Sequence, residues 1–253
     1  MKFKYQIITA GVVAAFLASA SNASAQDADE ESKKGFYTAV SAAVASVQDT
    51  TISYYDEGGT FGGTGATDRA DFKADLKKSA QFGGTIGYDF GVIRSDIEIA
   101  YSRNRISGLA IERINGAATT LTAADRADVC DYLEVTTCPG SGNSFTFSDG
   151  PKVRQLSALG NVWVDLPLGK VVTPYAGGGI GIAGFELDGE GKARFAWQLG
   201  AGVPIAVSRT VGITLDYRHR EAKDSRIASD SFSGFDIGKI RTNSFGAGLR
   251  FTF

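Results

Sequence analysis

The sequence predicts an all-β protein, an eight-stranded antiparallel up-and-down transmembrane β-barrel. Three observations lead to this prediction. Eight segments alternate apolar residues with small or polar ones at the period of a β-strand. The connections between these segments alternate between short turns and long polar stretches. Glycine contributes 32 of the 253 residues, nearly twice its usual share, and it occurs inside the apolar segments as well as between them.

Residues 1–25 form a predicted signal peptide, and residues 26–253 form the predicted barrel domain. A basic start is followed by an uncharged apolar stretch over residues 7–20, and Ala23 and Ala25 have the small side chains that signal peptidase recognises. We expect cleavage after Ala25. The alternative is a membrane anchor, but the apolar stretch is shorter than the roughly 20 residues of a spanning helix. Without this peptide the chain is mildly acidic, which gives no reason to expect a nucleic-acid partner.

The eight predicted strands lie at residues 36–44, 82–90, 93–102, 158–166, 176–182, 195–205, 211–217 and 245–253. Eight is the smallest even number of strands usual for a barrel that crosses a bilayer. Two prolines, Pro174 and Pro204, fall inside this strand pattern, and each removes one backbone hydrogen bond. Both are expected near the rim with the short turns, where water can satisfy the remaining carbonyl group.

The connections differ sharply in length on the two sides of the predicted barrel. Strands two and three, four and five, and six and seven are joined by a few residues each, at 90–91, 167–170 and 207–210. The other four connections run through about 30, 50, 10 and 20 residues rich in Gly, Ser, Thr and charged side chains, and we expect them to be loops. A soluble sandwich or soluble barrel has no reason to place every long loop at one rim, whereas a bilayer has two different sides.

The apolar face of each strand is expected to contact lipid, because the opposite faces carry charge. Those charged residues are Arg94, Asp96, Glu98, Asp216, Arg218 and Arg250. An eight-stranded barrel has an interior that side chains can fill, and the glycines fit that narrow space. We interpret the charges as a structural network in which they pair across the interior. The alternative is a narrow pore lined by the same charges.

Several short motifs carry a family resemblance over almost the whole of residues 26–253. They are SAQFGGTIGY at 79–88, RSDIE at 94–98, TPYAGGGIG at 173–181, FAWQLGAG at 195–202, LDYR at 215–218 and LRFTF at 249–253. In order and spacing they resemble the small porin-like and opacity-type outer-membrane barrels of Gram-negative bacteria, similar to the OmpA-like transmembrane domain.

The resemblance implies location in the cell outer membrane after export through the periplasm. It implies a structural and surface-antigen role in the cell envelope, with adhesion through long extracellular loops, and a small-solute porin-like channel as the alternative. The expected partners are outer-membrane lipid and lipopolysaccharide. In such families the last strand resembles the signal that the barrel-assembly machinery reads, which assigns that role to Leu249, Phe251 and Phe253.

The longest connection contains both cysteines, Cys130 and Cys138. In an exported chain this pair is predicted to form a local disulfide. A metal or redox pair is the alternative, but two thiols without a neighbouring histidine are too few ligands for zinc. Residues 121–133 also have helical spacing, which predicts a short helix within this loop. The loop is interpreted either as self-packed or as a recognition surface for a host or phage ligand.

The sequence does not predict an enzyme. The single histidine is His219, expected at the membrane-water boundary above Tyr217, and a Ser-His-acid site would need a serine next to it. The barrel lipid A deacylases resemble this region but have serine two residues after their histidine, where this chain has Glu221. The glycine run at 177–179 lacks the Lys-Ser/Thr of a phosphate-binding loop. We therefore expect neither a cofactor nor a bound metal.

Overall fold

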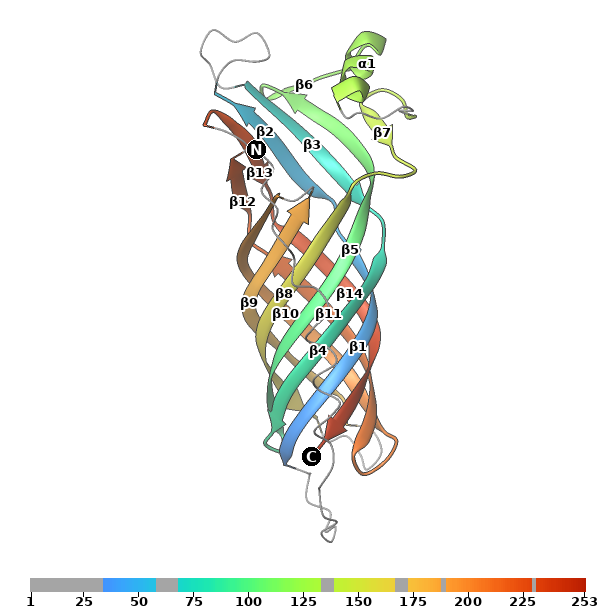
Figure 1. Ribbon diagram of the computed structural model, residues 1–253, viewed down its shortest axis with the longest axis vertical. Coiled ribbons are helices and arrows are strands. Elements are labelled where there is room, and N and C mark those ends of the chain that lie inside the picture. Colours follow the sequence, from blue (N-terminus) through green and yellow to red (C-terminus); the bar gives the residue numbers. More distant parts are fainter. Residues whose placement is uncertain (1–33, 58–67, 133–138, 167–172, 188–189, 229–230) are drawn as a thin grey trace, which may run out of the picture.

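The computed structural model describes residues 34–57, 68–132, 139–166, 173–187, 190–228 and 231–253. Eight of its strands form a closed antiparallel ring in which each strand pairs with its neighbours around the ring (Figure 1). In ring order they are β1 (Gly35–Val47), β4 (Ser79–Asp89), β5 (Ile93–Ile114), β8 (Lys152–Asp165), β9 (Tyr175–Leu187), β10 (Glu190–Ala206), β11 (Val211–Ala222) and β14 (Ile240–Thr252). The predicted fold class is confirmed. The predicted signal peptide, residues 1–25, lies outside the described residues.

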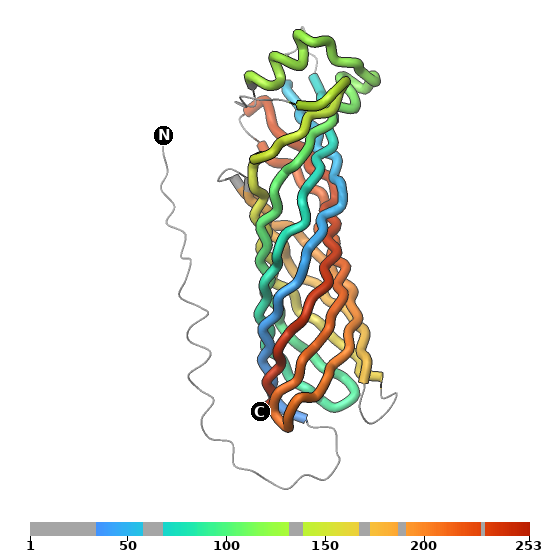
Figure 2. Tube along the Cα trace, turned by 90° about the vertical axis from the view of Figure 1, so that its right-hand side faces the viewer, coloured from blue at the N-terminus to red at the C-terminus, as the bar shows by residue number. Residues whose placement is uncertain are grey.

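A second sheet rises from one side of the barrel, and we call it the extension sheet (Figures 1 and 2). It consists of β12 (Ser225–Ala228), β13 (Ser233–Ile237), β2 (Thr50–Asp56), β3 (Asp68–Leu76) and the upper part of β5, in that order. Two short strands, β6 (Ala117–Ala118) and β7 (Ser144–Thr146), also pair with the upper part of β5.

The extension sheet corrects the expectation that the long connections are loops. The connections after the first and third predicted strands contain β2, β3, β6 and β7, and the connection after the seventh contains β12 and β13. The physical reason is that neighbouring barrel strands leave the rim already in register, so their backbones go on pairing. The polar composition of these segments hides the alternation from which the other strands were predicted.

Four of the five extension strands, all except the upper part of β5, continue a barrel strand across a break of two residues. The breaks are at 48–49 between β1 and β2, 77–78 between β3 and β4, 223–224 between β11 and β12, and 238–239 between β13 and β14. In β1 the inward side chains have odd numbers and include Val47, whereas in β2 they have even numbers and include Ile52. Each break thus shifts the alternation by one residue, as a β-bulge does.

The polarity of the wall is reversed across these breaks. In the barrel the outward side chains are apolar, and Ile97 and Ile180 are each 64% exposed, while Glu98 points inward and is buried. In the extension sheet the inward face carries Ile52, whereas Arg226 on the outward face pairs with a neighbouring carboxylate. This is the pattern expected for a barrel wall in lipid that continues into a wall surrounded by water.

Short turns close the lower rim of the barrel. Gly91 has a φ of 110°, which favours glycine, and the turn around it is closed by a bond of 2.9 Å from the backbone N–H of Phe90 to the carbonyl of Ile93. Pro204 lies inside β10, as predicted, opposite Thr214. Pro174 does not lie in a strand, because β9 begins at Tyr175. The predicted turn at 167–170 lies outside the described residues.

The upper tip contains the helix predicted for the longest connection. Helix α1 spans Ala123–Tyr132. Thr122 caps its N-terminus, since its Oγ1 accepts the backbone N–H of Asp125 at 3.2 Å and the Asp125 carboxylate accepts the Thr122 N–H at 2.7 Å. Within the described ranges, no helix is both long enough and apolar enough to cross a membrane.

Candidate functional site: the barrel interior and the chamber above it

The barrel interior is narrow because glycines on β9 face large side chains on β8. Gly177 lies directly opposite Trp163, and Gly179 lies directly opposite Asn161. A Cβ atom on either glycine would collide with the backbone of β8. The missing side chains therefore make room for the indole and amide groups that cross the interior, as the narrow interior of an eight-stranded barrel requires.

Asp96 on β5 is the acceptor at the centre of the lower polar layer. Its carboxylate accepts hydrogen bonds from the Tyr37 hydroxyl at 2.7 Å, the Trp163 Nε1 at 2.8 Å and the Asn161 Nδ2 at 2.7 Å. The Asn161 Oδ1 in turn accepts the Gln198 Nε2 at 2.6 Å. Donors from two other strands, β1 and β8, thus converge on one buried carboxylate, which satisfies its lone pairs without water.

Glu98 on β5 forms the next layer upward, with two arginines from the far side of the barrel. Its Oε1 accepts the Arg220 Nη2 at 2.9 Å, and its Oε2 accepts the Arg218 Nη1. Arg220 also donates to the Gln198 Oε1 at 2.9 Å, which connects the two layers. The Arg218 guanidinium lies over the Trp163 ring, 4.6 Å from its centroid. These contacts form a continuous polar network across the interior, and we call it the lumen network.

Two further ion pairs lie toward the lower rim. Arg94 donates twice to Asp165, with its Nε 2.9 Å from Oδ2 and its Nη2 2.8 Å from Oδ1. Arg250 pairs with Asp89. Beside them remains a polar cavity of about 30 Å³, which is room for one or two water molecules. Asp216 accepts the hydroxyl groups of Tyr175 and Thr214 and lies 3.7 Å from Arg218.

The structure brings some of the predicted interior charges together and gives others different partners. Glu98, Arg218 and Asp216 form one cluster. Arg94 and Arg250 bind carboxylates that sequence reasoning did not name. The residues that sequence reasoning missed are Asp89, Asp165, Arg220, Gln198, Asn161, Trp163, Tyr37 and Tyr175. Most of them share the strand alternation of the predicted charges, which is the signal that could have found them.

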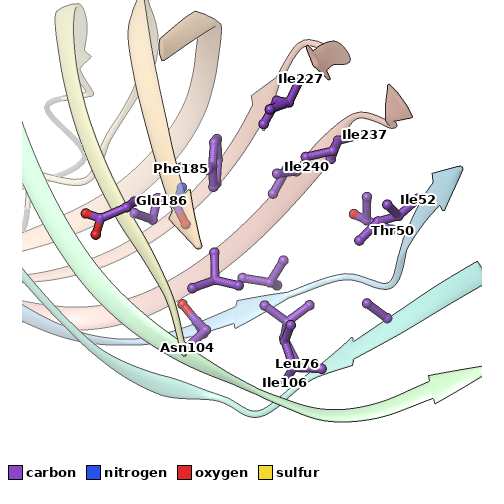
Figure 3. A pocket seen from close by; sticks show the side chains of 14 residues that line it. Thr50, Ile52, Leu76, Asn104, Ile106, Phe185, Glu186, Ile227, Ile237 and Ile240 are labelled. Atoms are coloured by element: carbon purple, nitrogen blue, oxygen red, sulfur yellow. The ribbon is translucent and has the colours of Figure 1, made fainter. Parts of the chain in front are cut away.

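Above the lumen network lies an apolar cavity of about 90 Å³, which we call the chamber (Figure 3). Its wall comes from both the barrel and the extension sheet, and Figure 3 shows the labelled isoleucines of β2, β5, β12, β13 and β14 around a common space. Asn104 and Gln155 are the amides among its lining residues, and each is hydrogen-bonded, to the Lys77 carbonyl at 3.1 Å and to the Thr242 hydroxyl at 3.4 Å. The chamber surface is therefore almost wholly apolar.

Arg194 lies beside the chamber wall. Its guanidinium is 5.0 Å from the centroid of the Phe185 ring, and Phe185 lines the chamber. Its Nη1 donates to the carbonyl of Lys223 at 3.2 Å. Within the described residues its Nε and Nη2 are buried and have no hydrogen-bond partner. A buried cation thus lies behind one aromatic side chain of the wall.

The outward face of the extension sheet carries an ordered set of ion pairs. Arg226 donates from Nε and Nη2 to the two oxygens of Asp236, at 2.7 and 3.0 Å, and lies over the Tyr55 ring. Arg69 approaches both Asp236 and Asp71 at 3.3 Å. The hydrogen bond from Arg226 lowers the pKa of the Asp236 carboxyl below its usual value, and the charges of Arg226 and Arg69 act in the same direction.

His219 faces outward and not into the barrel interior. Its Nδ1 lies 2.7 Å from the Asn243 Oδ1, and its ring lies 5.6 Å from that of Trp197. The hydroxyl of Tyr217 donates to the same Asn243 oxygen at 2.9 Å. Among the described residues, no group of three or more His, Cys, Asp and Glu side chains could hold a metal ion.

The remaining predicted residues lie at the two ends of the molecule. Cys130 is in α1 and is disulfide-bonded. Cys138 lies outside the described residues, so the pairing of these two cysteines stays a prediction. Leu249 and Phe251 lie in β14, and Phe253 directly follows it at the lower rim, where its N–H donates to the Phe36 carbonyl at 2.9 Å.

Comparisons with known proteins find similar sequences and similar structures. A Brucella abortus protein of uncharacterised function is 26% identical over 214 residues, which cover 70% of this chain and 70% of that protein. A Brucella suis protein matches to the same extent. The crystal structure of OprG from Pseudomonas aeruginosa is similar with a TM-score of 0.52 at 13% identity, over 88% of this chain and 98% of that one. The neisserial surface protein A structure has a TM-score of 0.49 at 16% identity, over 87% of this chain and 97% of that one.

The profile of the outer membrane protein beta-barrel domain matches residues 12–253, which is nearly the whole chain. The closed ring of eight strands with an apolar outer surface is the architecture by which such proteins cross the bilayer. This chain therefore belongs to the outer membrane β-barrel family, and it is located in the outer membrane.

Proposed function

We propose that this protein is a structural and surface protein of the cell envelope, in which the barrel provides the anchor and the extension sheet with its tip provides a recognition surface. The observation that carries the proposal is the extension sheet itself. Four barrel strands continue past the upper rim in new strands, and β5 continues without a break. Long connections face the cell exterior in outer-membrane barrels, which assigns this sheet to the outside.

The chemistry of the extension sheet supports a surface role. The ion pairs among Arg69, Asp71, Arg226 and Asp236 hold charged groups in defined positions on its outward face. Helix α1 and the strands around it are largely exposed at the tip. Rigid strands that carry exposed, variable segments are a common arrangement for binding. We infer a host or phage surface ligand as the partner of this region.

A tip deletion separates the anchor from the recognition surface. We would replace residues 117–146 by a short Gly-Ser linker and express this variant, the full chain and an empty vector in a strain that lacks the protein. The full chain should restore detergent resistance and increase attachment of cells to host cells, and the tip variant should restore only detergent resistance. Equal attachment by the full chain and the vector, at matched surface amounts, would refute the recognition role.

The lumen network argues against a continuous aqueous pore. Asp96, Glu98 and Arg220 are all buried, and their side chains bond to partners from other strands across the interior. A hydrated ion would have to break several charge-assisted bonds to pass. We expect no sustained single-channel steps when the refolded protein is recorded in a planar bilayer. Stable steps of uniform size would support the porin-like alternative instead.

A second candidate function, binding of small apolar solutes, is favoured by the chamber. Its volume of about 90 Å³ and its isoleucine-rich wall suit part of a hydrocarbon molecule, since dry apolar cavities of about 150 Å³ hold benzene. A polarity-sensitive hydrophobic dye should bind the full chain in nanodiscs, and Ile52→Asn should weaken its binding. Thr51→Asn on the outward face is the matched control. Equal dye binding by both variants would exclude the chamber as the site.

A further inference from the structure

Six basic side chains gather on the outside of the barrel where β4, β5 and β8 reach the upper rim. We call them the basic patch; they are Lys77, Lys78, Arg103, Arg105, Lys152 and Arg154. In the β5–β8 pair, Arg103 lies directly opposite Arg154, and Arg105 lies directly opposite Lys152. The Lys77 N–H donates to the Arg105 carbonyl at 2.8 Å, which joins the β3–β4 break to the same patch.

The basic patch contains more positive charge than its carboxylates neutralise. Arg154 pairs with Glu186 at 2.7 Å, and Arg105 pairs with Asp149. The other four basic side chains form no ion pair with any described residue; they are Arg103, Lys77, Lys78 and Lys152. A further carboxylate, that of Asp75, lies two residues before Lys77 in the sequence. Like charges directly opposite each other on adjacent strands destabilise a sheet. Two such pairs at successive outward positions of the same strand pair are a feature that an anion would relieve.

The height of the basic patch on the barrel indicates which part of the membrane it faces. Two residues below Arg103 on β5 is Tyr101, which is opposite Leu156 on β8 and Phe82 on β4. These three side chains face outward and are 41%, 55% and 60% exposed, as expected in the lipid-facing surface. Two residues along a strand, about 7 Å, separate this apolar surface from the patch. The patch therefore lies at the depth of the lipid headgroups on the extracellular side.

The opposite side of the barrel has a smaller excess of positive charge at this level. There Glu221 on β11 pairs with Lys239 at 3.0 Å and with Arg241 at 2.9 Å. On the patch side, Lys73 on β3, which pairs with β5, is neutralised by Asp49 at 2.7 Å. Lys223, just after β11, lies over the Phe195 ring at 5.6 Å and forms no ion pair with a described residue. The excess of positive charge is therefore larger on the β4, β5 and β8 face, and the Glu221 cluster offers a matched control.

We propose that the basic patch binds the phosphate groups of an outer-leaflet glycolipid, whose acyl chains lie on Phe82, Tyr101 and Leu156. A phosphate oxygen accepts several donors at once, and arginine pairs with phosphate in a bidentate manner. Opposed side chains on adjacent strands are about 5 Å apart at Cβ, so a single phosphate can contact both members of a pair. This site lies on the barrel wall and does not depend on recognition by the tip.

The direct test compares two double variants of the full chain in nanodiscs. R103Q/K152Q removes two unpaired charges of the patch, and K239Q/R241Q removes two charges on the opposite side. Binding is measured by native mass spectrometry with bisphosphorylated lipid A. At about 1 kcal/mol per basic side chain near a headgroup, R103Q/K152Q should bind about 30-fold more weakly than the unchanged chain. K239Q/R241Q should change the affinity by less than about threefold.

Three further probes identify the ligand chemistry. Dephosphorylated lipid A, phosphatidylglycerol and inorganic phosphate should each bind the unchanged chain more weakly than bisphosphorylated lipid A does. Equal binding of the dephosphorylated lipid would overturn the assignment to phosphate. Equal binding of phosphatidylglycerol would overturn the assignment to a glycolipid, and equal binding of inorganic phosphate would overturn the role of the acyl chains.

A stability measurement in lipid-free zwitterionic detergent gives a second, independent readout. There R103Q/K152Q should raise the thermal midpoint, because it removes like-charge opposition from both cross-strand pairs. K239Q/R241Q should leave the midpoint unchanged or lower it, because it removes ion pairs to Glu221. A lower midpoint for R103Q/K152Q would mean that the patch is stabilised within the protein and needs no external anion.

Discussion

The Glu98 carboxylate on β5 accepts a hydrogen bond of 2.9 Å from the Arg220 guanidinium on β11, across the barrel interior from a residue 122 positions away in the chain. Both side chains are about 95% buried. The same carboxylate also binds Arg218. One acidic side chain thus pairs with two cations, the buried Arg220 and Arg218, of which only Arg218 lies near a second carboxylate, that of Asp216.

Replacing Glu98 by Gln should therefore lower the free energy of unfolding strongly. Removing one partner of a buried ion pair costs about 3–5 kcal/mol, because the remaining charge has neither water nor a counter-ion. Glu186→Gln is the control, since Glu186 and Arg154 are both one-third or more exposed and such pairs contribute about 0–1 kcal/mol. Urea unfolding followed by heat-modifiable gel migration measures both. Equal losses in the two variants would contradict the central role of Glu98.

Gly179→Ala should also destabilise the barrel. A Cβ atom there would collide with the β8 backbone at Gly160 and with Asn161, and overpacking of this kind costs about 1–3 kcal/mol. Gly160→Ala, directly opposite Ile180 on the same strand pair, is the control because its added methyl meets nothing within 4 Å. Thermal unfolding in detergent should separate the two variants. A Gly179→Ala variant as stable as Gly160→Ala would show that the interior has spare room.

The extension sheet should loosen at acid pH before the barrel does. Arg226 lowers the pKa of Asp236 in the folded chain. The ionised Asp236 carboxylate therefore stabilises the fold at pH values above the usual aspartate pKa near 3.8. This stabilisation is lost as the pH falls through the lower pKa of the folded chain. Hydrogen exchange at pH 2.5 and pH 6 should show a loss of protection in β12 and β13, after correction for intrinsic rates. Unchanged protection at pH 2.5 would count against this dependence, and Asp236→Asn should show the loss at both pH values.

Thr122→Ala should weaken helix α1 by about 1 kcal/mol, a typical effect of losing an N-terminal cap. The Thr122 hydroxyl satisfies the backbone N–H of Asp125, and the reciprocal bond from the Thr122 N–H holds the Asp125 carboxylate in place. Limited proteolysis of the tip should be several-fold faster in this variant. Thr120→Ala, just outside the cap, should leave the rate unchanged, and the same acceleration in both variants would argue against capping.

The lipid-facing surface could be predicted from the sequence because it repeats every second residue. Ile97 lies between Asp96 and Glu98, Ile99 follows Glu98, and this alternation is visible without any partner strand. The extension strands could not be predicted in the same way. Their inward and outward residues are displaced by one position at each break, so the alternation does not run on from the barrel strands.

The partners within the lumen network were also beyond the reach of the sequence. Arg94 could be assigned to the interior from its place in the alternation, but its pairing with Asp165 depends on the register between β5 and β8. Arg250 was expected to pair with another of the predicted interior charges, yet it pairs with Asp89 at the end of β4. The alternation within one strand contains no information on the register between that strand and its neighbours.

By itself, the sequence determined that this chain forms an eight-stranded barrel with apolar side chains toward lipid and charges inside, because each strand must satisfy that alternation locally. Only the tertiary structure decided which charges pair, where the chamber lies and that Arg103 meets Arg154. These features depend on the register and the tilt at which eight strands close into a ring, and closure is a property of all the strands together.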